Sequence, residues 1–268
     1  MFSKTIPKLF PLSAPLIHCI TNEISSELLA NGLLFIGAKP IMAEDPREFA
    51  ELFQATDSLF LNLGKMSPAK EASLIAASQL AGTKPVVLDI VGTQASTLRN
   101  ELARKLAADQ PTVIKGNISE MRAFCGLTSQ SRGVDGHVGD QEGVALDELI
   151  DHLKALPATS TYLATGKKDI VVHQQAVYIL ENGVPELDCF TGTGDLVGAL
   201  IAGLLGARVD ALTATLVTVS YFNVCGEVAK TKLLPTVGMA DFRQETLNQL
   251  SVLYQKEDWQ KQVRGSKR

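Results

Sequence analysis

Short apolar runs rich in β-branched residues alternate along the chain with longer segments whose apolar residues recur every three to four positions. The short runs predict a first strand ending at His18, strands at residues 39–45, 58–64, 84–92, 111–117 and 161–166, and a hairpin at 170–180. Strands that alternate with helices are typical of a mostly parallel sheet flanked by helices on both faces. Because the runs are apolar almost throughout, both sheet faces are expected to be buried, as in an α/β fold.

Helix starts are marked by capping residues and proline. Asp45-Pro46 and Ser67-Pro68 each place a capping side chain before a proline at the first helical position. Further helices are expected at residues 21–36, 95–108, 118–124, 144–156 and 241–253, with two apolar helices after residue 195. Residues 126–141 predict a surface loop, and residues 255–268, with Trp259, predict a solvated end. No repeat or linker divides the chain, so we expect a single domain over residues 1–268.

Composition narrows the class of protein. The 268 residues contain 25 Lys and Arg against 29 Asp and Glu, a net charge of −4, and no basic stripe, so nucleic acid is not an expected partner. Residues 196–219 are strongly apolar, but Arg208 and Asp210 interrupt them before the roughly 18 residues of a membrane span, so no membrane contact is expected.

The cysteines and the first 20 residues indicate in which cellular compartment the protein is located. Cys19, Cys125, Cys189 and Cys225 form no C-x-x-C pair, which predicts neither a zinc cluster nor a disulfide framework. Three prolines interrupt the first 20 residues, and no cleavage site follows, so no signal peptide is expected. A reducing, cytoplasmic location fits both observations.

Two acidic residues stand where predicted strands end. Asp89 closes the strand VVLD, and Glu120 lies three residues after Asn117 at a helix start. Ligands of open α/β sheets bind beyond the carboxyl ends of the strands, and magnesium favours carboxylates beside substrate phosphates. Asp89 and Glu120 together therefore predict a magnesium site. Asp89 equally fits an ordinary turn, and Asn117 with Glu120 equally fits a capping box.

A possible nucleotide site lies at the same strand ends. Lys115 could meet a phosphate as a point charge, and Thr165 could offer a hydroxyl or backbone group to ATP. Lys115 also fits an ordinary exposed lysine at a strand end, and Thr165-Gly166 also fits a simple turn. Residues 192–195, Gly-Thr-Gly-Asp, precede an apolar helix whose first N–H groups and dipole suit a transferring phosphoryl group. This motif is neither a Walker A loop nor a dinucleotide loop, and alone it also fits a simple helix cap.

Six segments, in order, resemble the hydroxyethylthiazole kinase family, thiamine-salvage enzymes of the ribokinase-like fold. They are HCITNEISSELLANGLLFIGAKPIM (18–42), VVLDIVG (86–92), VIKGNISE (113–120), GVD (133–135), TG (165–166) and GTGD (192–195). The resemblance implies a homotrimer with active sites between subunits, and magnesium-dependent transfer of the ATP γ-phosphate to the alcohol of 4-methyl-5-(2-hydroxyethyl)thiazole. It also implies residue roles: thiazole contact for Met42 and Gly192, ATP binding for Lys115 and Thr165, magnesium binding for Asp89 and Glu120, and proton acceptance for Asp195. Asn22 is implied as a further substrate contact.

Three positions depart from the family pattern. The turn after Asp89 reads Ile-Val-Gly-Thr-Gln instead of Pro-Val-Gly-Ala-Gly, Lys115 replaces a common arginine, and Asp195 replaces a usual cysteine. Aspartate, with an ordinary pKa of about 3.9 against about 8.5 for cysteine, is the better proton acceptor at neutral pH. These departures leave open a kinase of another small alcohol such as a hydroxymethylpyrimidine, a non-catalytic binding protein, or a nucleotide-dependent dehydratase on the same fold.

Overall fold

The computed structural model describes residues 6–128, 143–233, 236 and 238–268. One nine-stranded sheet runs through this part of the chain in the order β2-β1-β3-β4-β5-β6-β7-β8-β9. The first six strands in that order are parallel, and β7, β8 and β9 join them antiparallel. The strands are β1 (Leu16–Ile20), β2 (Lys39–Ile41), β3 (Ser58–Asn62), β4 (Val86–Asp89), β5 (Val113–Asn117), β6 (Thr161–Thr165), β7 (Asp169–His173), β8 (Ala176–Leu180) and β9 (Gly265–Lys267). The predicted α/β class, the mostly parallel sheet and the β7–β8 hairpin are confirmed.

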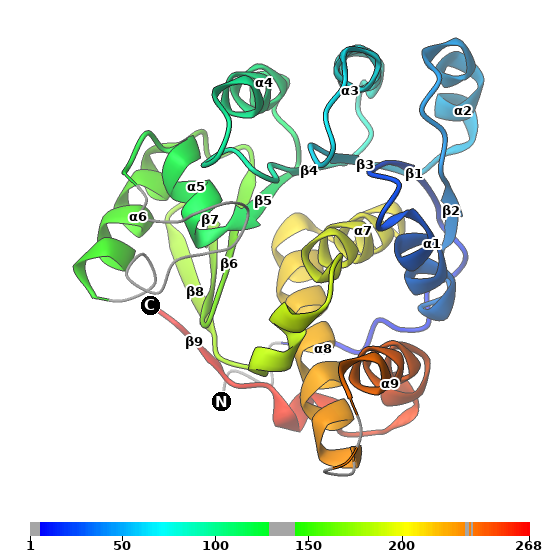
Figure 1. Cartoon of the computed structure of the whole chain (residues 1–268), viewed down its shortest axis with the longest axis vertical. Helices are drawn as coiled ribbons and strands as arrows, with labels where there is room; N and C mark the ends of the chain where they lie inside the picture. The colour runs from blue at the N-terminus through cyan, green and yellow to red at the C-terminus, as the bar shows by residue number, and fades with distance from the viewer. Residues whose placement is uncertain (1–5, 129–142, 234–235, 237) are drawn as a thin grey trace.

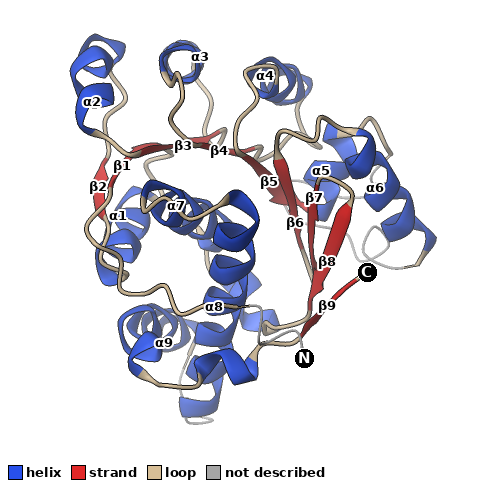
Figure 2. Cartoon of the chain, turned by 180° about the vertical axis from the view of Figure 1, so that it is seen from behind, coloured by secondary structure: helices blue, strands red, loops and turns tan. Residues whose placement is uncertain are grey.

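Helices cover both faces of the sheet, as Figure 1 shows and Figure 2 repeats from behind. The concave face carries α1 (Ser26–Phe35), α7 (Thr193–Gly206), α8 (Ala211–Lys232) and α9 (Met239–Val252). The other face carries α2 (Phe49–Ala55), α3 (Pro68–Leu80), α4 (Thr97–Ala107), α5 (Ile118–Phe124) and α6 (Val144–Ala155). Short 3₁₀ helices are η2 (Pro46–Glu48), η4 (Pro185–Cys189), η5 (Leu253–Gln255) and η6 (Trp259–Gln262).

The core is divided by the sheet into two apolar layers. Along β4, Val87 packs with the α7 and α8 layer, whereas Val86 and Leu88 pack with the layer of α2 to α6. Val113 and Ile114 of β5 divide in the same way. Successive side chains of a strand point to opposite faces, so these strands are apolar at every position because both faces are covered. The predicted burial of both faces is confirmed.

The first helix begins later than its periodicity predicts. Asn22 Oδ1 accepts hydrogen bonds from the backbone N–H of Ser25, at 3.0 Å, and from its hydroxyl, at 3.1 Å. This local turn competes with the helix, and α1 starts only at Ser26. Ile24 therefore lies outside the helix and is 72% exposed. The predicted caps at Asp45 and Ser67 are confirmed, since each side chain accepts a hydrogen bond from the backbone of the first turn.

The prediction of a solvated end holds for most residues of the segment 255–268, which are exposed, but was wrong for Trp259. Trp259 is 1% exposed, and its ring packs edge-on against Tyr221 of α8 with centroids 4.9 Å apart. Arg264 pairs with Glu227 of α8 at 2.6 Å, and β9 then adds to the sheet beside β8. The charged residues of this segment predict exposure, but the segment also contains one large aromatic side chain, and burial of that side chain ties the segment to the core.

Helix α8 is long and apolar enough to cross a membrane by composition, yet 67% of its most apolar window is buried within the structure. Its side chains belong to the layer that it shares with α7 and α9. The predicted buried helices after residue 195 are confirmed. The predicted loop at 126–141 lies outside the described residues from residue 129 on, and so does the segment GVD (133–135).

Candidate active site

Three polar residues lie side by side near the carboxyl ends of β3, β4 and β5: Asn62 and Asp89 end their strands, and Lys115 is the third of the five residues of β5. The sheet register places Asn62 opposite Asp89, and Asp89 opposite Lys115. Lys115 Nζ is 2.7 Å from Asp89 Oδ2, and the two side chains are 3% and 0% exposed. Lys115 is thus the partner of a buried carboxylate, not the exposed strand-end lysine that its position in the sequence also allowed.

The ion pair changes the titration of both members. Burial raises the pKa of Asp89 to about 6, against the opposing effect of Lys115. Burial lowers the pKa of Lys115, but the Asp89 carboxylate outweighs this, so the net direction is upward. Both groups are therefore charged at pH 7, and the pair is ionised, with the protonated lysine stabilising a carboxylate 2.7 Å away.

Helix α7 brings its N-terminus to these strand ends through two glycines. Gly192, the N-cap, has φ +95°, and a Cβ there would lie 2.7 Å from Leu28 of α1. A Cβ on Gly194 would lie 3.6 Å from Lys115 Nζ, so the first turn of α7 sits close to the buried ammonium. The first N–H groups of α7 and the Lys115 charge together favour an anion at this point.

Asp195 lies in the first turn of α7 and is 9% exposed. Its Oδ2 accepts a hydrogen bond from the Asn22 side-chain amide, and its Oδ1 accepts one from the Asn62 amide, both at 2.9 Å. Each carboxylate oxygen carries two lone pairs, so each retains one for a further donor. Asp195 can therefore accept a proton from a hydroxyl group placed beside the α7 N-terminus.

Glu120 ties the turn after β4 to helix α5. Its Oε1 accepts from Gly92 N at 2.8 Å and its Oε2 from Asn117 N at 2.7 Å, while Asn117 Oδ1 accepts from Glu120 N. The alternative of a capping box is therefore confirmed. Burial raises the pKa of Glu120 to about 7, and the nearby Asp89 adds to this rise.

These carboxylates also fit a magnesium ion that arrives with a nucleotide. Asp89 Oδ1 is buried without a hydrogen-bond partner, and each Glu120 oxygen has a lone pair beyond its backbone hydrogen bond. Within the described residues no group of three or more His, Cys, Asp or Glu converges on one point. Magnesium commonly uses one or two carboxylates and takes its other ligands from phosphates and water, which matches this donor set.

The other predicted residues flank this centre. Thr165 ends β6, two strands or about 10 Å from β4, and its hydroxyl is 3.4 Å from Gly116 O. Met42 follows β2, three strands or about 14 Å from β4 on the other side, and is half-buried. Gly192 and Asp195 contact α1 and Asn22, on the Met42 side of the centre.

The segment that carries Met42 is anchored by buried polar side chains. His18 Nε2 lies 2.9 Å from Ala43 O and must be the donor, and burial lowers the pKa of this imidazole. Ser73 Oγ donates to Glu44 O at 2.6 Å, and Lys70 Nζ pairs with the Glu44 carboxylate at 2.7 Å. His18 thus lies in mid-strand and shapes the Met42 side of the site through the backbone, without facing the site itself.

Sequence reasoning missed three polar residues of this region: Asn62, Lys70 and Asp169. Asn62 had a readable signal, because it ends the apolar run SLFLN just as Asp89 ends VVLD. Lys70 lies within α3 and is 6% exposed, and nothing local marks it as buried. Asp169 precedes an apolar strand and resembles an ordinary turn residue.

Asp169 gives a prediction for stability. It is 4% exposed and accepts hydrogen bonds from Gly166 N at 3.1 Å and Asn223 Nδ2 at 2.7 Å, and burial raises its pKa to about 7. The folded chain therefore binds one proton more than the unfolded chain between about pH 4 and 7. The resulting stability is complete below that window and is lost as pH rises through it, by about 1.4 kcal/mol per pH unit at most.

Urea unfolding from pH 5 to 8 will measure this loss. Asparagine does not titrate in this range, so the free energy of unfolding of the variant Asp169→Asn should depend less steeply on pH than that of the unaltered chain. Equal slopes for the two chains would contradict the prediction.

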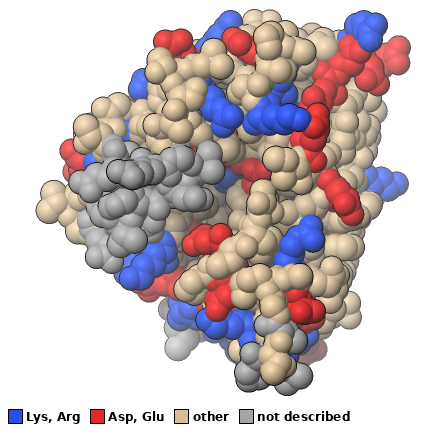
Figure 3. Space-filling model, viewed as in Figure 1, with Lys and Arg blue, Asp and Glu red and all other residues tan. Residues whose placement is uncertain are grey.

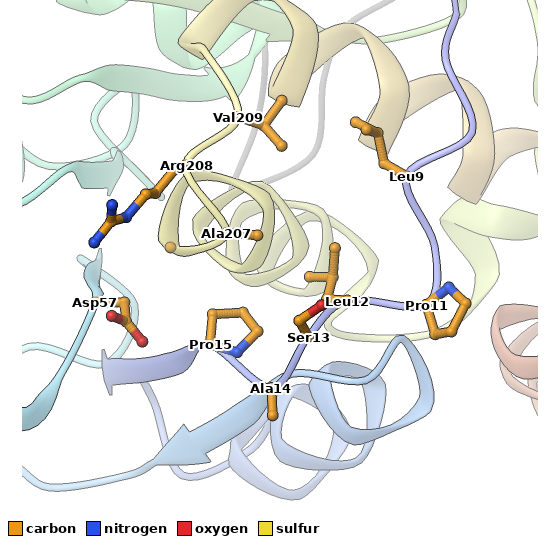
Figure 4. Close-up of a pocket in the computed structure, with 11 residues that line it drawn as sticks. Leu9, Pro11, Leu12, Ser13, Ala14, Pro15, Asp57, Ala207, Arg208 and Val209 are labelled. Atoms are coloured by element: carbon orange, nitrogen blue, oxygen red, sulfur yellow. The ribbon is translucent and has the colours of Figure 1, made fainter.

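A separate cavity of about 360 Å³ lies at the other end of α7 (Figure 4). Residues 206–209 and the segment from Leu9 to Pro15 line it, together with Asp57. The 14 residues of α7 span about 21 Å, so this cavity is remote from Asp195. On the molecular face seen in Figure 3, basic and acidic side chains are intermixed.

Comparisons with known proteins show the family to which the chain belongs. Residues 8–256 match the family model described as "Hydroxyethylthiazole kinase family". The chain belongs to the hydroxyethylthiazole kinase family. It is 57% identical over 264 residues to the hydroxyethylthiazole kinase of Enterococcus faecalis, with 96% of each chain covered. It is 52% identical over 258 residues to that of Lacticaseibacillus casei, with 94% of this chain and 92% of the relative covered.

Solved structures confirm the fold of this family member. A hydroxyethylthiazole kinase protein from Pyrococcus horikoshii superimposes with a TM-score of 0.81 at 26% identity, over 95% of this chain and 94% of that one. The pyridoxal kinase from Staphylococcus aureus, at 13% identity, has a TM-score of 0.58 over 78% of this chain and 86% of its own. The second match supports the fold alone, which is the ribokinase-like architecture that the sequence predicted.

Proposed function

We propose that this chain transfers the γ-phosphate of ATP to the primary alcohol of 4-methyl-5-(2-hydroxyethyl)thiazole, a reaction of thiamine salvage. The observation that carries the proposal is the position of Asp195. Its carboxylate lies in the first turn of α7, beside helix N–H groups that favour an anion and near the buried Lys115. A proton acceptor beside a phosphate-binding helix start is what phosphorylation of an alcohol requires.

The reaction follows from these groups. Asp195 accepts the hydroxyl proton as the alcohol oxygen attacks the γ-phosphorus. The bond from phosphorus to the bridging oxygen of ADP breaks, which yields ADP and the phosphate ester. Because charge on the transferring phosphoryl group dominates such transition states, the α7 N–H groups and Lys115 should contribute more than proton removal.

The two flanks of the site suit two substrates. Thr165 on β6, with Lys115 on β5, would hold ATP, and Asp89 and Glu120 would hold its magnesium. When bound, magnesium would neutralise part of the phosphate charge. Met42 and Gly192, on the β2 and α1 side, would contact the thiazole. Asp195 lies between these flanks, where the hydroxyl and the γ-phosphate must meet.

We further propose a homotrimer with active sites between subunits, located in the cytoplasm. Met42 follows β2, which is the outermost strand on that side of the described sheet. Leu34 of α1 and Ile24 are 53% and 72% exposed, and a neighbouring subunit could cover them. All four cysteines are free thiols, which fits a reducing compartment. Sedimentation of the purified protein measures the assembly state.

The substrate proposal is tested by ADP release from ATP and magnesium. The hydroxyethylthiazole should support saturable turnover, with kcat/KM at least about tenfold above that of a hydroxymethylpyrimidine alcohol. 5-Ethyl-4-methylthiazole, in which hydrogen replaces the hydroxyl group, is the matched control and should support none. Preference for the pyrimidine would favour the kinase of another alcohol, and absence of turnover with every alcohol would favour a binding protein.

A further inference from the structure

The amides of Asn22 and Asn62, here called the amide pair, each have one possible orientation. Asn62 Oδ1 lies 2.8 Å from Gly64 N, and Asn22 Oδ1 lies 3.0 Å from Ser25 N. A backbone N–H can only donate, so each amide must turn its oxygen towards it. The two NH₂ groups must therefore face Asp195, one on each carboxylate oxygen, at 2.9 Å.

Gly64 closes the space behind the amide pair. A Cβ at this residue would lie 2.7 Å from Asn22 Nδ2 and 2.8 Å from Asn62 Oδ1, distances that real Cβ atoms do not show. Gly64 is not among the glycines with a left-handed backbone. Its backbone conformation does not require glycine. The reason for glycine here is space, because a side chain would occupy the volume that the two amides fill.

We propose that Asn62 and Gly64 are positioning residues, which with Asn22 fix the direction in which Asp195 presents its remaining lone pairs to the alcohol. This inference rests on the proposed kinase function. Asn62 is 0% exposed, and its Nδ2 also lies 3.4 Å from Asp89 Oδ2. The Asn62 amide therefore contacts both the proposed base, Asp195, and the ion pair of Asp89 with Lys115. Neither residue touches a substrate; both act through the Asp195 carboxylate.

Orientation matters here because phosphoryl transfer depends on placement of the attacking oxygen. A misplacement of about 1 Å can cost about 100-fold in rate. A carboxylate held by one amide can rotate about its terminal torsion, whereas hydrogen bonds to both oxygens fix its plane. Loss of Asn62 should therefore lower kcat more than it affects binding of the alcohol.

The charged groups that face Asp195 are Asp89 of β4, Lys115 of β5 and Lys70 of α3. All three remain when Asn62 is replaced. The loss should therefore appear in kcat and not in the KM for the alcohol, a split that a purely structural role of Asn62 would not produce.

The test compares Asn62→Ala and Gly64→Ala with Asn100→Ala as the matched control. Asn100 donates to Ala123 O at 3.0 Å on the far side of the sheet, so it holds the fold without touching Asp195. We expect Asn62→Ala to lower kcat by about 10- to 100-fold with the KM for the alcohol within about threefold. Gly64→Ala should act in the same direction, and Asn100→Ala should leave kcat and KM unchanged.

A kinetic double-mutant cycle separates positioning from general damage. In an Asp195→Asn background, Asn62→Ala should lower kcat by less than about threefold, because the carboxylate that it orients is gone. An equal loss in both backgrounds, or a rise in KM as large as the fall in kcat, would overturn the inference while the kinase function stands. If the unaltered chain phosphorylates no alcohol, the kinase function fails and the catalytic role of the amide pair fails with it.

Discussion

Replacing Asp195 by asparagine is expected to lower kcat about 100-fold, with a smaller change in KM for ATP. The variant keeps the size of the side chain but cannot accept the proton of the alcohol. It also places an NH₂ group against the NH₂ of Asn22 or Asn62, where the structure has hydrogen bonds of 2.9 Å. The expected loss lies at the lower end of the range for general bases, because charge stabilisation dominates phosphoryl transfer.

The matched control is Asp147→Asn, which removes the same charge elsewhere. Asp147 lies on α6, is 56% exposed and pairs with Arg268 at 2.6 Å. An exposed pair of this kind contributes little, so kcat should not change. The kcat of each variant is measured from initial rates of ADP release at saturating alcohol. A kcat for Asp195→Asn within about threefold of that of the unaltered chain would show that Asp195 is not the proton acceptor.

Replacing Lys115 by methionine is expected to cost about 3–5 kcal/mol of stability at pH 8 and to abolish measurable turnover. The variant leaves the Asp89 carboxylate buried at 0% exposure without its counter-charge. The loss should be smaller at pH 5, because Asp89 can then be buried as a neutral acid. Turnover is lost because the ammonium beside the first turn of α7 is gone.

The double variant Asp89→Asn/Lys115→Met isolates the charge effect. Removing both partners of a buried pair costs much less than removing one, so most of the stability should return while turnover does not. Lys261→Met is the control, since Lys261 and its partner Asp258 are 76% and 65% exposed and should matter little. Urea unfolding measures the free energy of unfolding of each variant. A double variant no more stable than Lys115→Met would contradict the prediction that the unpaired Asp89 carboxylate causes the loss.

The predicted site residues meet at one edge because the sheet is parallel there. Asp89 and Lys115 are 26 positions apart in the sequence, and the register makes them adjacent. The assignment of magnesium to Asp89 and Glu120 and of ATP to Lys115 and Thr165 stays a prediction. Asn62 could have been included on the same strand-end rule, since SLFLN and VVLD have the same pattern.

The sequence by itself determined the α/β class, the order of most elements, the helix caps at Asp45 and Ser67 and the family, because these follow from local periodicity, capping and motif order. Only the tertiary structure decided that Lys115 is a buried counter-ion, that two asparagines hold Asp195, and that Trp259 is in the core. These facts depend on contacts between residues as far as 173 positions apart, as for Asn22 and Asp195. Burial and hydrogen bonding across such separations are set by how strands and helices pack, and no local pattern contains them.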